Sequence, residues 1–85
     1  MWKLKYFEKA LKISMEIGDR YGEAEVYSHL GTLSLSLRKY RNSKTCYDKA
    51  LAVLSEIGSK PLEAEVYRYL GCLLQSLSDN VKAKE

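Results

Sequence analysis

The fold is decided by residues 16–31, EIGDRYGEAEVYSHLG, and residues 56–71, EIGSKPLEAEVYRYLG. A shift of 40 residues aligns the two stretches without a gap, and the match continues on both sides of them. Self-similarity at a period of roughly 20–50 residues indicates an array of repeats. We therefore expect stacked repeat units. The flanking matches pair Lys9-Ala10-Leu11 with Lys49-Ala50-Leu51, and Ser36-Leu37 with Ser76-Leu77.

The apolar residues inside each period recur in steps of three and four residues. This spacing places them on one face of a helix, and the alternation typical of strands is absent. The chain is therefore predicted to be all-α, with helices at about 3–17, 22–37, 41–57 and 61–77 and a truncated fifth helix beginning near Val81. The four apolar sets are Tyr6, Ala10, Ile13 and Ile17; Val26, Leu30, Leu33 and Leu37; Cys46, Ala50, Val53 and Ile57; and Val66, Leu70, Leu73 and Leu77.

Glycines lie at the ends of two predicted helices and inside two others. Gly18 and Gly58 follow predicted helices, where a left-handed backbone is common and Gly adopts it without steric cost. Short connections of this kind make neighbouring helices antiparallel. Gly31 and Gly71 lie inside helices, where Gly costs about 1 kcal/mol relative to Ala. Because they recur once per repeat, we expect them to mark close approaches of a partner helix.

The composition narrows the class of protein. With 85 residues, of which 46 % are apolar and 29 % are charged, the chain fits one small globular unit. A net charge of +3 with interspersed acidic residues argues against nucleic acid as a partner, although single-stranded RNA is kept as an alternative. No run approaches the roughly 18 apolar residues that span a bilayer, so we expect no membrane insertion and a cytoplasmic location. One His and two Cys offer too few ligands for a metal site, and no cofactor is expected.

The chain resembles the tetratricopeptide repeat family, whose unit is two helices joined by a turn. The matching residues are Tyr27, Leu30 and Gly31 in one first helix; Ser43, Tyr47 and Ala50 in the second helix after it; Tyr67, Leu70, Gly71 and Ala83 in the next unit; and Phe7 and Ala10 in an earlier second helix. The resemblance divides a single array over 1–85 into the second helix of an incomplete repeat (1–21), a complete repeat (22–60) and an incomplete repeat (61–85).

The 40-residue period exceeds the about 34 residues usual in this family. It is similar to the longer repeats of G-protein-signalling-modulator scaffolds, in which a string close to residues 16–24 is common. The resemblance implies antiparallel hairpins stacked as a right-handed α-solenoid. Its concave wall is built from the first helix of each repeat.

Solenoids use such concave surfaces for binding, so we expect a groove that binds a peptide or a helix of a partner protein. All the residues that the resemblance places on the wall lie off the apolar stripes, and an ordinary solvated face is the alternative. Arg68 and Tyr69 are the expected hot spot for an acidic side chain, because Arg and Tyr dominate interface energetics. The wall residues are Glu25, Ser28, His29, Thr32, Glu65, Arg68, Tyr69, Cys72 and Gln75.

These features predict a non-catalytic protein-interaction scaffold. The sequence has no phosphate-binding Gly loop and no nucleophile motif, so we do not expect an enzyme. His29 has no evident metal or catalytic partner and is interpreted as a polar groove residue. The alternative function is a structural segment of a larger protein that self-associates or stacks on neighbouring repeats, because terminal repeats of solenoids need a polar cap. An apolar stripe on Phe7, Leu11 and Met15 would then need a cover.

Overall fold

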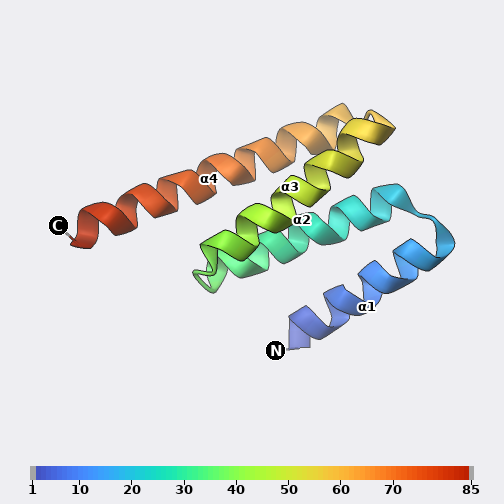
Figure 1. Ribbon diagram of the computed structural model, residues 1–85, viewed down its shortest axis with the longest axis horizontal. Coiled ribbons are helices and arrows are strands. Elements are labelled where there is room, and N and C mark those ends of the chain that lie inside the picture. The colour runs from blue at the N-terminus through green and yellow to red at the C-terminus, as the bar shows by residue number, and fades with distance from the viewer. Residues whose placement is uncertain (1, 85) are drawn as a thin grey trace.

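The computed structural model describes residues 2–84, with side chains up to residue 79, and this range forms four helices. They are α1 (Trp2–Ile17), α2 (Arg20–Ser36), α3 (Tyr40–Ile57) and α4 (Lys60–Lys84). Each helix packs antiparallel against the one before it, and α2 also touches α4 (Figure 1). The molecule is flat, measuring 48 × 30 × 14 Å along its principal axes. The prediction of an all-α chain of antiparallel helices is confirmed.

The three connections share one backbone geometry, in which a residue adopts the left-handed conformation. Gly18 (φ 74°) and Gly58 (φ 71°) do so after α1 and α3, as the sequence predicted. In each connection an N–H donates to the carbonyl five residues earlier, as in a Schellman motif. Arg38 takes the left-handed conformation after α2, with φ 61°. A residue with a Cβ is strained there by about 1 kcal/mol, and this strain was not evident from the sequence.

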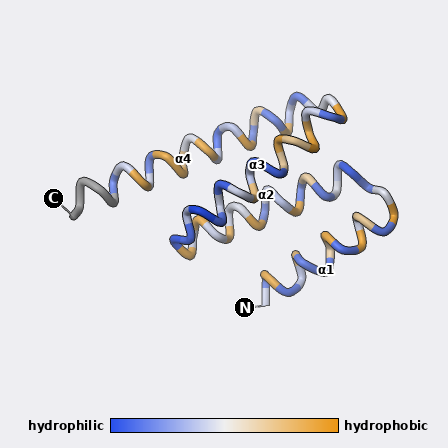
Figure 2. The backbone as a smooth tube through the Cα atoms, viewed as in Figure 1, coloured by the Kyte–Doolittle hydropathy of each residue, from blue (hydrophilic) through white to orange (hydrophobic). Residues whose placement is uncertain are grey.

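The hydrophobic core lies between α2, α3 and α4. Tyr47 is fully buried in it, and its hydroxyl shares a 2.8 Å hydrogen bond with that of Thr32. By contrast, α1 packs only on α2, so it keeps apolar residues at the surface. Figure 2 shows hydrophobic positions along α1. None of the described helices is long and apolar enough to cross a membrane. The buried cluster consists of Ala24, Tyr47, Ala50, Val53, Leu54, Leu62, Val66 and Leu73.

The two glycines inside the helices have different surroundings. A Cβ built on Gly31 would lie 2.6 Å from a ring carbon of Tyr47, so this glycine does mark a close approach between α2 and α3. Gly71 is exposed, and a Cβ built there would meet no heavy atom within 4 Å. The expectation is therefore confirmed for Gly31 and wrong for Gly71 within this structure.

The fifth helix expected near Val81 is wrong, because α4 continues without interruption from Lys60 to Lys84. Residues 78–80 contain no Gly, and the Gln75 amide donates to Asp79 Oδ1 at 3.3 Å across the expected turn. The equivalent turn after α2 is followed at once by α3, which packs back onto α2. No described helix packs back onto α4 in this way, so nothing in this range opposes continued helix.

Stacked aromatic pairs between helices repeat with the same 40-residue shift as the sequence. Phe7 of α1 stacks on His29 of α2, with ring centroids 5.5 Å apart. Tyr47 of α3 stacks on Tyr69 of α4 at 5.7 Å. The contact between α1 and α2 at this point is therefore equivalent to the contact between α3 and α4. Phe7 and Leu11 of the expected exposed stripe are consequently half-buried against α2.

Candidate functional site

A cleft of about 170 Å³ lies between α2 and α4. It brings together five of the nine residues that the sequence placed on the concave wall. The two helices are neighbours in space, and residues three and four apart on a helix share a face. Each helix therefore aims one face at the cleft. The predicted residues in the lining are Glu25, Ser28 and His29 from α2, and Glu65 and Tyr69 from α4.

Tyr21 and Leu62 complete the lining and were missed by the sequence analysis. Tyr21 precedes Glu25 by four residues, and Leu62 precedes Glu65 by three. Both belong to the same helix faces as the residues that were found. Extending each face by one turn towards the helix start would have identified them.

The other predicted residues lie elsewhere. Thr32 lines a second groove, of about 400 Å³, between α1 and α2, which His29 also lines. Arg68, Cys72 and Gln75 are exposed and line neither hollow. Arg68 is exposed, and its positive charge acts to lower the pKa of Tyr69, against the larger effect of Glu65. That Arg68 and Tyr69 form one hot spot stays a prediction.

Ser28 is buried at 5 % exposure, and its hydroxyl is already engaged. It donates to the Ala24 carbonyl at 3.1 Å, in the i to i−4 pattern common for Ser in helices. Thr32 likewise donates to the Ser28 carbonyl at 3.1 Å. The hydroxyls of both residues are therefore satisfied within the protein.

The charged residues of the cleft are carboxylates. Glu25 and Glu65 face it from opposite helices, and none of its lining residues is Lys or Arg. The Tyr69 hydroxyl donates to Glu65 Oε1 at 2.7 Å. This hydrogen bond to a carboxylate, with desolvation second, raises the pKa of Tyr69, so the hydroxyl stays protonated and holds Glu65 in place. The cleft is therefore a negatively charged hollow with aromatic walls.

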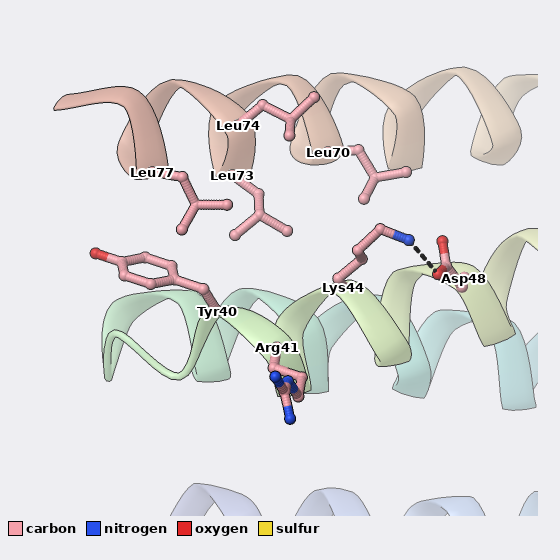
Figure 3. A pocket seen from close by; sticks show the side chains of 8 residues that line it. All are labelled: Tyr40, Arg41, Lys44, Asp48, Leu70, Leu73, Leu74 and Leu77. Atoms are coloured by element: carbon pink, nitrogen blue, oxygen red, sulfur yellow. Dashed lines mark hydrogen bonds and ion pairs between the residues drawn. The ribbon is translucent and has the colours of Figure 1, made fainter. Parts of the chain in front are cut away.

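A larger and more apolar groove, of about 420 Å³, lies between α3 and residues 70–77 of α4 (Figure 3). This groove was not predicted from the sequence. Leucines of α4 form one wall, and Tyr40 and the Lys44–Asp48 ion pair, 2.8 Å long, stand on α3 opposite them. Its α4 lining residues are Leu70, Leu73, Leu74 and Leu77.

No family model matches the chain, and no curated protein or solved structure matches it. The chain is a small all-helical unit, and each of its four described helices packs on the one before it.

Proposed function

We propose that the chain is a non-catalytic scaffold of the tetratricopeptide type that binds a peptide of a partner protein in the cleft between α2 and α4. The observation that carries the proposal is the convergence of five predicted wall residues on that one cleft. The 40-residue sequence repeat and the stacked aromatic pairs that follow it support the repeat interpretation.

The ligand best suited to the cleft carries a Lys or Arg side chain. Glu25 and Glu65 supply negative charge from both walls, and Tyr21 and Tyr69 supply aromatic rings. A cation is attracted both to carboxylates and to the face of an aromatic ring. The volume of about 170 Å³ is below the about 300 Å³ and more of small-molecule pockets, so one side chain fits better than a whole ligand. This replaces the acidic ligand expected at Arg68.

The rest of the peptide would follow α2 into the neighbouring groove between α1 and α2. His29 lines both hollows, so they adjoin at this residue. The second groove has Phe7 and Leu33 as apolar contacts and Thr32 and Ser36 as polar ones. An extended peptide could thus place a basic residue in the cleft and an apolar residue beside Phe7.

The test is fluorescence anisotropy with short labelled peptides that differ only in a central Lys, Arg, Glu or Ala. We expect the Lys and Arg peptides to bind best, and the Glu25→Gln and Glu65→Gln double variant to bind them roughly five- to tenfold more weakly. The matched control is Glu8→Gln, which removes a carboxylate from exposed α1. Unchanged binding by the double variant, or a preference for the Glu peptide, would contradict the proposed site.

A further inference from the structure

Two helix faces are exposed although their equivalents in the repeat are covered. The first is on α4. On α2, Ala24 belongs to the buried core and the Tyr47 ring lies against Gly31, so this face meets α3. Forty residues later on α4, Tyr67 is 60 % exposed and Gly71 has open space around it. The exposed face of α4 consists of Ala64, Tyr67 and Gly71, equivalent to Ala24, Tyr27 and Gly31.

The second face is on α1. On α3, Ser43 donates to the Gly31 carbonyl at 2.8 Å, which orients one side of α3 towards α2. The apolar residues that follow on this side, Cys46, Ala50 and Val53, are all buried or half-buried. At the equivalent positions of α1, Tyr6 is 63 % and Ile13 is 53 % exposed. The exposed face of α1 consists of Tyr6 and Ile13 with the half-buried Ala10 between them.

We propose that these two faces bind each other between copies of the chain. The exposed face of α4 in one copy packs against the exposed face of α1 in another, in the arrangement that α2 and α3 adopt within one copy. The occupant is a second copy because the repeat makes this contact a continuation of the α2–α3 interface. The contact leaves the cleft between α2 and α4 free, and it shares Phe7 with the groove between α1 and α2.

A cation–aromatic contact of the α2–α3 interface has its counterpart on the open faces. The Lys49 ammonium of α3 lies 5.6 Å from the ring centroid of Tyr27 on α2. The equivalent residues are Lys9 on α1 and Tyr67 on α4. The repeat thus has the same Lys and Tyr at these positions, although Lys9 and Tyr67 do not meet within one copy. Docking would place Lys9 of one copy over the exposed Tyr67 ring of another.

The charges at the end of the interface are also complementary. Arg20 of α2 forms a 2.5 Å ion pair with Glu56 of α3. Lys60 on α4 and Glu16 on α1 stand at the equivalent positions. Lys60 pairs with Glu63 at 3.6 Å, as Arg20 pairs with Glu23, and its side chain is 86 % exposed, so a second copy can still approach it. The docked pair of α4 and α1 would therefore place a basic residue opposite an acidic one, as α2 and α3 do within one copy.

The aromatic contact at the centre is changed in a compatible way. Within the chain, Tyr47 lies against Gly31 and its hydroxyl bonds to that of Thr32 at 2.8 Å. Between copies, Phe7 would lie against Gly71 beside Cys72. Phe7 has no hydroxyl, and the threonine that would have bonded to it is replaced by a thiol. The polar pair is lost from both partners together, so no hydroxyl would be buried without a partner.

The groove of Figure 3 acquires further lining residues in this arrangement. Its equivalent between α1 and α2 is lined by Leu4, Glu8, Leu30 and Ser34, and α3 adds Asn42, Thr45 and Cys46 to this lining. The counterparts of these three α3 residues are Trp2, Lys5 and Tyr6 of α1. A docked α1 would therefore bring Trp2, which is 79 % exposed, to the leucines of α4.

Because the contact joins two different faces, any assembly of copies has a free α1 face at one end and a free α4 face at the other. A contact of this kind builds open chains of copies unless it closes into a ring. Sedimentation velocity should show species larger than a dimer as the concentration of the 85-residue chain rises. The fluorescence of Trp2, the only tryptophan, should shift to shorter wavelengths in step. A chain that stays monomeric at the highest concentration would overturn the proposal.

Two single variants test the faces separately. Gly71→Ala adds a methyl where Phe7 of another copy would lie, and Ile13→Glu places a charge on the exposed face of α1. Each should weaken association by about tenfold or more without loss of helix by circular dichroism, because both sites are open within one copy. Lys12→Ala, an exposed change on another side of α1, should associate as the unaltered chain does.

Mixing the two variants decides the geometry. The Gly71→Ala copy keeps its α1 face and the Ile13→Glu copy keeps its α4 face, so an equimolar mixture should form one-to-one dimers and stop there. Association of either variant alone at the unaltered strength, or a mixture that remains monomeric, would overturn the proposal. Peptide binding by Gly71→Ala should be unchanged, which separates this result from the fate of the proposed peptide cleft.

Discussion

Replacing Gly31 by alanine should destabilise the chain, whereas the same change at the equivalent Gly71 should stabilise it. In an exposed helix, Gly to Ala gains about 1 kcal/mol. Gly71 has open space for the added methyl, so Gly71→Ala should raise the free energy of unfolding by about 0.5–1 kcal/mol. The methyl added at Gly31 would lie 2.6, 2.8 and 2.9 Å from three ring carbons of Tyr47.

The Tyr47 ring has little room to move away. It is fully buried, it is stacked on Tyr69, and its hydroxyl bonds to Thr32. Overpacking of a core costs about 1–3 kcal/mol, and displacement of the ring would also weaken the hydrogen bond, worth about 1 kcal/mol. After the gain in helix propensity, Gly31→Ala should lower the free energy of unfolding by about 1–3 kcal/mol.

The assay is urea denaturation followed by circular dichroism, at a protein concentration low enough to exclude association. The two midpoints should move in opposite directions from that of the unaltered chain, with unchanged slopes. A Gly31→Ala variant as stable as Gly71→Ala would refute the reasoning, because it would mean that α2 and α3 do not approach closely at this residue.

Three further predictions concern the turn, a buried tyrosine and the thiols. Arg38→Gly should stabilise the chain by about 1 kcal/mol, measured by urea denaturation, because it removes a side chain from a residue with φ 61°; a lower midpoint would contradict the strain. Burial raises the pKa of Tyr47 in the folded chain, so folding favours the protonated hydroxyl. This contribution to the free energy of unfolding is complete below about pH 10, the pKa of Tyr in the unfolded chain. It is lost as the pH rises through the pKa of Tyr47 in the folded chain. The stability of Tyr47→Phe should therefore fall less steeply between pH 9 and 11, and equal slopes would exclude this cause. Burial also raises the pKa of the Cys46 thiol, whereas Cys72 is exposed, so a chromogenic disulfide reagent should modify Cys72 first; faster modification of Cys46, mapped by mass spectrometry, would contradict the assigned burial.

The sequence predicts those parts of the fold that depend on local pattern. Apolar spacing located all four helices, and Gly18 and Gly58 identified two of the three turns, because a left-handed backbone selects for Gly directly. The turn at Arg38 carries no such signal, because Arg is not a residue that favours a left-handed backbone. The error at Val81 has a different cause. Whether α4 stops depends on a partner helix behind it, which local sequence does not reveal.

The candidate cleft could be predicted in part for a related reason. Position in the repeat was enough to place Glu25, His29, Glu65 and Tyr69 on facing sides of α2 and α4. It was not enough for Arg68, which is exposed and does not line the cleft, because periodicity does not fix how far each helix is rotated towards the other. The carboxylates in the lining are the reason that we propose a basic ligand in place of the acidic one expected at Arg68.

The molecule measures 14 Å along its shortest axis and 48 Å along its longest. Its stability therefore depends mainly on the interfaces between adjacent helices, and α1 has one such interface, with α2. Stability in such a layer is a sum over neighbours, so the outermost helix can detach at a fraction of the cost of global unfolding. Amide hydrogens of α1 should exchange with solvent faster than those of α3, which has a helix on either side. The chain is thus built to loosen from its edge inward.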